Sequence, residues 1–122
     1  MTSPEPPRPT YFLTPADLGA WFDAHADASE VWVGLWKKGF ERPGISYAEA
    51  VDEALCNGWI DSIVRRVDEA SYMARFTPRR VRSSWTDANL RRVEELRAEG
   101  RLKPGGAAAY AAAHDAPRRP KR

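Results

Sequence analysis

Six side chains that could hold an anion or a flat ring crowd into one short stretch of this chain. They are Trp59, Asp61, Arg75, Arg79, Arg80 and Trp85. Guanidinium groups grip phosphate or carboxylate through paired hydrogen bonds, and indole rings can stack on a base or a sugar. We therefore interpret the stretch as a binding surface for an anionic ligand, either a small molecule or a segment of a partner protein. The residue types identify no reaction.

Asp61 allows two interpretations. It lies two positions after Trp59 on a predicted strand, so the two side chains share one face. An unpaired buried carboxylate is costly, and Arg79 or Arg80 could partner it. Asp61 is then either the acceptor or general base of a ligand site, or one half of a structural clamp between two turns. The clamp is the simpler interpretation, because structural ion pairs also perturb acids.

Positive charge gathers in the second half of the chain. The net charge is −6 over residues 1–64, +5 over residues 65–103 and +3 over residues 104–122. This split favours an anionic partner, although a solvated surface of mixed charge also fits it. Nucleic-acid binding by the basic hairpin and tail is the alternative function, without the aromatic-Gly-aromatic signature of an RNA-binding sheet. Its candidate residues are Arg65, Arg66, Arg75, Arg82, Arg118 and Arg119.

A third hypothesis is an enzyme that uses Asp61 or Cys56. Cys56 is the single cysteine, and its only imidazole candidates, His25 and His114, lie far from it along the chain. A buried structural thiol is therefore the favoured interpretation. One cysteine and two histidines at unrelated spacings do not build a usual metal site, and no glycine-rich phosphate loop is present. We predict no metal and no cofactor, and a binding domain rather than an enzyme.

The composition predicts a single cytoplasmic domain. The chain has 122 residues, of which 43% are hydrophobic and 11% aromatic, enough for one core. No secretory signal and no apolar run long enough to cross a bilayer is found, so we expect no membrane insertion. We expect a disordered segment over residues 1–9, the domain over residues 10–114 and a basic disordered tail over residues 115–122. The oligomeric state is not readable.

Periodicity and capping residues predict an α+β fold, a small antiparallel sheet of about three strands packed against about four helices. The helices are expected near residues 15–26, 46–57, 86–99 and 104–113. The strands are expected near residues 31–38, 59–66 and 71–77, the last two forming a hairpin. Thr14 and Ser46 can cap the first two helices, and Gly58 is the expected left-handed terminator of the second. Residues 31–38 are apolar on both faces, which predicts a central strand; the strand order is not readable.

The chain resembles the YdeI/OmpD-associated family, also called bacteriocin-protection proteins. The likeness covers roughly residues 10–113. It is carried by the segments SYAEAVDEALC at 46–56, GWID at 58–61, RFTPRR at 75–80 and Ser84-Trp85. The resemblance implies a bacterial protein linked to tolerance of bacteriocins or cationic peptides, a form of stress tolerance, and an association with a porin. It implies no known reaction, and the shared Trp, Asp and Arg residues look like either a common site or a structural hub.

Overall fold

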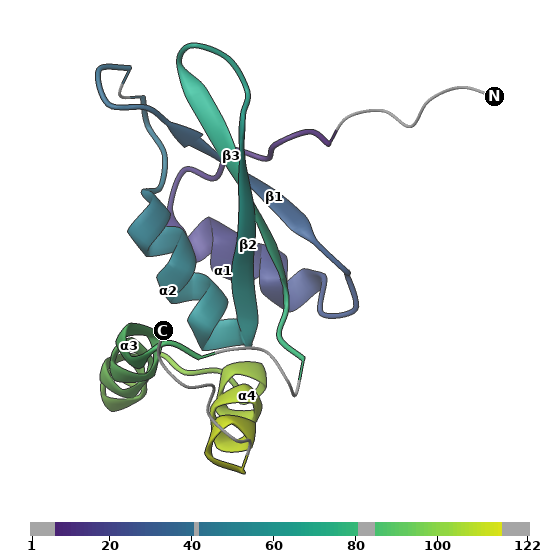
Figure 1. The fold of residues 1–122 in the computed structure, drawn as a ribbon, viewed down its shortest axis with the longest axis vertical. Coiled ribbons are helices and arrows are strands. Elements are labelled where there is room, and N and C mark those ends of the chain that lie inside the picture. The colour runs from purple at the N-terminus through teal and green to yellow at the C-terminus, as the bar shows by residue number, and fades with distance from the viewer. Residues whose placement is uncertain (1–6, 41, 81–84, 116–122) are drawn as a thin grey trace, which may run out of the picture.

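The computed structural model describes residues 7–40, 42–80 and 85–115, with only the backbone of the last two residues. Within these ranges the chain forms four helices and three strands (Figure 1). They are α1 (Pro15–Ala24), β1 (Val31–Trp36), α2 (Tyr47–Asn57), β2 (Trp59–Arg66), β3 (Ser71–Pro78), α3 (Asp87–Ala98) and α4 (Pro104–Asp115). This confirms the predicted α+β class. The first helix and the first strand each end two residues earlier than expected, and the last helix continues two residues further.

The helix ends follow from local chemistry. The Thr14 hydroxyl accepts a hydrogen bond from the Asp17 amide at 3.2 Å and caps α1. At α2, the Ser46 hydroxyl accepts from the Glu49 amide at 3.1 Å, and the Glu49 carboxylate accepts from the Ser46 amide at 2.9 Å. This reciprocal capping box satisfies two backbone donors that a helix start would leave unpaired. Gly58 ends α2 in the left-handed conformation, at φ +81°.

The sheet has the order β1-β3-β2 and is antiparallel throughout. The prediction that the first strand is central was wrong, because β3 takes that place and β1 lies at the edge. The N-terminal segment covers this edge: the Thr10 amide donates to the Trp32 carbonyl, and the Gly34 amide donates to the Thr10 carbonyl, both at 2.8 Å. The Tyr11 ring also lies so close to Gly34 that a β-carbon there would meet it at 2.5 Å. An apolar strand can therefore sit at an edge when another segment covers it.

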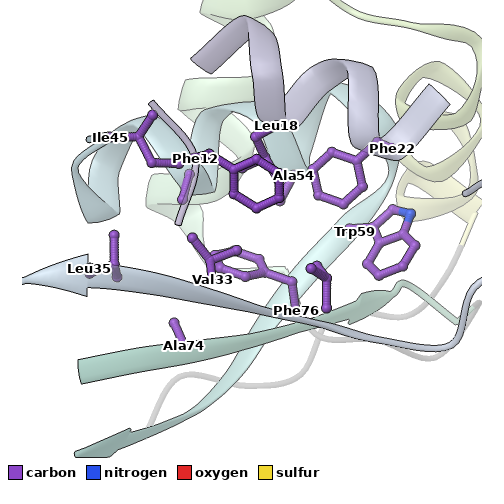
Figure 2. Packing of buried hydrophobic residues seen from close by; sticks show 12 residues of the cluster. Phe12, Leu18, Phe22, Val33, Leu35, Ile45, Ala54, Trp59, Ala74 and Phe76 are labelled. Atoms are coloured by element: carbon purple, nitrogen blue, oxygen red, sulfur yellow. The ribbon is translucent and has the colours of Figure 1, made fainter. Parts of the chain in front are cut away.

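The main core lies between the sheet and the first two helices. Val33 and Phe76 reach it from the sheet, Leu18 and Phe22 from α1, and Ala54 from α2, as Figure 2 shows. Val33, Leu18 and Phe76 are fully buried. Burial of these side chains on one face of the sheet is the main stabilising contribution expected for a fold of this size.

A second, smaller layer closes one end of the molecule. α3 and α4 lie together beyond the end of the sheet, beside the end of α2 (Figure 1). The core of this layer consists of Leu55 and Cys56 from α2 and Leu96 from α3, and Trp85 packs against it. Helices α2 and α4 approach closely, since a β-carbon on Gly106 would lie 2.3 Å from the Cys56 carbonyl oxygen. This layer fixes the position of Trp85 relative to the end of β3.

Candidate functional site

A hollow of about 400 Å³ opens where β1 begins and β3 continues past it. Its lining residues are Ser29, Arg75, Thr77, Pro78, Arg79 and Arg80. The pairing between β1 and β3 reaches only to Val31 opposite Phe76, whereas β3 extends to Pro78. The loop before β1 therefore forms one wall, and the last residues of β3 with the two arginines after them form the other. Three of the six residues predicted as a binding surface meet here.

Two residues at the end of β3 have no backbone donor directed into the hollow, Pro78 and Arg79. The Arg79 amide donates to the Gly58 carbonyl at 2.9 Å and so points toward β2. Neighbouring strand residues direct their backbone groups to opposite sides, so Pro78 faces the side where β1 has ended. Proline has no amide hydrogen, and no donor is left unmet there. Neither Pro78 nor Arg79 therefore offers a backbone donor to the hollow, and the side chains of the described lining residues supply guanidinium and hydroxyl groups.

Arg79 is held by an aromatic ring. Its guanidinium carbon lies 3.8 Å from the centre of the Trp85 ring. Burial lowers the pKa of Arg79 to about 10, and the negative charge of Asp61 opposes this shift. The side chain still carries its charge at neutral pH. Trp85 thus positions an arginine of the hollow and does not itself line it.

Arg75 has an acidic partner at the rim of the hollow. The Arg75 Nε atom donates to the Glu30 Oε1 atom at 2.7 Å. Arg75 pairs across the sheet with Trp32, which brings it beside the loop that carries Ser29 and Glu30. Sequence reasoning missed this partner, because 45 residues separate the two side chains.

Trp59 and Asp61 do not line the hollow, although the charge of Asp61 acts on Arg79. Trp59 is 4% exposed and packs in the core, with its ring centre 5.0 Å from that of Phe22. Asp61 is half-buried and accepts a hydrogen bond from the Tyr47 hydroxyl at the start of α2. Burial and this bond to Asp61 raise the pKa of Tyr47 above its usual range. The expected cluster of six is therefore divided between a hollow and the core, and Tyr47 is a partner of Asp61 that sequence reasoning missed.

The arginines of the hairpin lie on an exposed strand. Arg65 and Arg66 are exposed on β2, and the Arg65 guanidinium carbon lies 5.5 Å from the centre of the Trp32 ring. Arg75 belongs to the hollow. The remaining candidates for nucleic-acid binding, Arg82, Arg118 and Arg119, lie outside the residues that the structure describes.

Comparison with known families gives one match. The family described as Domain of unknown function (DUF8412) matches residues 10–109, which include the sheet, the first three helices, the start of α4 and the described lining of the hollow. The chain belongs to this family. The comparisons of this chain with curated proteins and with solved structures found no match. The DUF8412 match does not bear on the resemblance to YdeI/OmpD-associated proteins, which stays a prediction.

The surroundings of Cys56 and His25, the candidates for catalysis in this DUF8412 member, indicate structural roles. Cys56 is 2% exposed, and burial raises the pKa of its thiol, which disfavours the reactive thiolate. His25 stacks on Trp21 with ring centres 4.4 Å apart and lies at the C-cap of α1. Over the described ranges, no three His, Cys, Asp or Glu side chains gather as a metal site would require, and no helix has the length and apolar character to span a bilayer.

Proposed function

We propose that this chain is a non-enzymatic binding domain that captures an anionic ligand in the hollow at the end of β3. The observation that carries the proposal is the meeting of Arg75, Arg79 and Arg80 in one hollow of about 400 Å³. Each guanidinium offers five N–H donors in a planar fork that matches the oxygens of phosphate or carboxylate. The hydroxyls of Ser29 and Thr77 add two further donors to the same hollow.

Electrostatics support this use of the arginines. Burial removes part of the hydration of the Arg79 guanidinium, and the charge of Asp61 offsets part of this cost. An anion bound in the hollow would stabilise the charged form of Arg79 further. The hollow is open to solvent and small, so it suits a small molecule or the charged end of a partner segment better than a large apolar ligand.

The tryptophans favour charge recognition over base stacking. Trp36 stacks on Tyr11, with ring centres 4.8 Å apart, and Trp21 stacks on His25. Trp59 lies in the core, while Trp32 and Trp85 each lie against a guanidinium group. A nucleic-acid base that stacked on one of these faces would have to displace a present neighbour. We therefore place the nucleic-acid alternative second.

We further propose that the protein acts in the cytoplasm. A connection with tolerance of bacteriocins or cationic peptides rests on the resemblance to YdeI/OmpD-associated proteins. An anion-binding cytoplasmic domain would influence a porin or a peptide indirectly, through the ligand or partner that it binds.

The proposal can be tested by titrating the ¹⁵N-labelled protein with phosphate, nucleotides and acidic peptides. We expect shifts of the Nε resonances of Arg75, Arg79 and Arg80 and of the indole resonance of Trp85. Arg80→Gln should weaken binding, whereas Arg91→Gln, an exposed arginine on α3, should leave it unchanged. Absence of shifts at all four side chains would refute the proposal.

A further inference from the structure

Glu30 lies beside the anion site and already pairs with one of its arginines, Arg75. Its carboxylate contacts Arg75 at 2.7 Å, and its neighbour Ser29 lines the hollow. Both partners are partly exposed, with 36% of the Arg75 side chain and 42% of the Glu30 side chain accessible. An exposed pair of this kind contributes little to stability and can be exchanged for another ion pair. Glu30 is therefore an internal competitor of the ligand for Arg75.

This competitor discriminates between classes of anion. A free monocarboxylate that replaced Glu30 would exchange one carboxylate for another and gain no new bond to Arg75. Glu30 also has the advantage of being tethered, which gives it a high effective concentration. A phosphomonoester has three terminal oxygens and nearly two negative charges at neutral pH, so it can bind Arg75, Arg79 and Arg80 together. The exchange is then favourable.

The lining limits the rest of the ligand. Among the lining residues that the structure describes, only Pro78 is apolar. Sites for ligands with an apolar body are lined mostly by hydrophobic and aromatic side chains. The walls here offer guanidinium and hydroxyl groups, which suit a small hydrophilic body such as a polyol or a sugar.

We infer that the hollow selects small hydrophilic phosphomonoesters and that Glu30 is the residue that excludes monocarboxylates. This inference rests on the proposed function and adds the ligand class to it. Arg75 is the point of selection, because it must leave Glu30 for the phosphate. The other two arginines bind the same phosphate from the end of β3.

Calorimetric titrations of the full chain with glycerol 3-phosphate and with acetate test the ligand class. We expect glycerol 3-phosphate to bind at least about tenfold more tightly than acetate, since charge-assisted bonds to several guanidinium groups add up. If the two probes bound with equal affinity and Arg80→Gln abolished the binding of both, the phosphomonoester class would be overturned while anion binding in the hollow would stand. Binding of neither probe nor of the nucleotides and acidic peptides above would overturn the proposed function itself.

Glu30→Gln tests the competitor. It should tighten acetate binding by a larger factor than glycerol 3-phosphate binding, so the ratio of the two affinities should narrow. Asp27→Asn, at an exposed acid of the same loop, should leave that ratio unchanged. A ratio unaffected by Glu30→Gln would overturn the role of Glu30. A phosphoserine peptide that bound about tenfold more tightly than glycerol 3-phosphate would overturn the small-ligand part and indicate a protein partner.

Discussion

Arg79 lies with its guanidinium carbon 3.8 Å from the centre of the Trp85 ring. This contact joins the end of β3 to the layer formed by α3 and α4, because Trp85 packs against Leu55 and Leu96. The two helices therefore contribute to the hollow without lining it. They position the Trp85 ring, and the ring positions the Arg79 guanidinium group.

Replacement of Trp85 should weaken anion binding through Arg79. A cation–π contact contributes about 0.5–2 kcal/mol, so Trp85→Leu should lower the affinity for phosphate by about two- to thirtyfold. Trp85→Phe keeps an aromatic face and should retain most of the affinity. Titrations of both variants, with urea unfolding to confirm that each is folded, separate positioning from stability. Equal affinities of the Leu and Phe variants would show that the ring has no part in binding.

The bond between Tyr47 and Asp61 should make stability fall at high pH. Burial and the Asp61 carboxylate raise the pKa of Tyr47 in the folded state, while the unfolded chain loses this proton near about pH 10. The unfolded state then binds fewer protons than the native state, so the free energy of unfolding falls as pH rises above that value. The contribution is complete below about pH 10 and is lost as the pH approaches the folded pKa.

The contribution of the hydrogen bond between Tyr47 and Asp61 can be measured with Tyr47→Phe. At neutral pH the variant should lose about 1.5–3 kcal/mol of stability, the range for a hydrogen bond to a charged group. Between about pH 9 and 11 it should lose less further stability than the unchanged protein, since the titrating hydroxyl is gone. Parallel pH profiles of the two proteins, measured by urea unfolding, would contradict the assignment.

Local chemistry explains which parts of the fold the sequence could predict. Thr14 and Ser46 cap the starts of α1 and α2, and Gly58 ends α2. Each does so through hydrogen bonds or backbone angles within a few residues, so these signals are local. The edge position of β1 was missed because its cover, Tyr11, comes from a segment some twenty residues earlier in the chain. Contacts of that kind depend on tertiary packing, which periodicity does not encode.

The candidate site was partly predictable for a related reason. Arg75, Arg79 and Arg80 lie within six residues, so their meeting required only the end of one strand. Asp61 was expected beside them; its charge does act on Arg79, but its carboxylate is hydrogen-bonded to Tyr47, and it pairs with Phe76 on the face of the sheet that looks toward the helices. Glu30 was not foreseen, because the register that opposes Trp32 to Arg75 brings it there. Register is a property of the assembled sheet.

Cys56 should react slowly in the native protein. Its side chain is buried, and burial raises the pKa of its thiol, so little thiolate is accessible at neutral pH. Modification by a disulfide reagent at about pH 7.5 should be at least about a hundredfold slower than in denaturant, since it requires opening of the structure. A native rate close to the unfolded rate would contradict the structural role and support the enzyme hypothesis that uses this thiol.

Gly58 should tolerate alanine far less well than Gly100, although both have positive φ angles of +81° and +74°. A β-carbon on Gly58 would lie 2.6 Å from the Gly105 carbonyl oxygen, whereas at Gly100 no described residue lies within 4 Å of it. Both substitutions incur the left-handed backbone cost of about 1–2 kcal/mol. Gly58→Ala also forces α4 away from the end of α2, which adds about 1–3 kcal/mol. Urea unfolding compares the two variants. An equal loss at the two sites would mean that α4 shifts from α2 without cost, and α4 would then not help to hold Trp85 and, through it, Arg79.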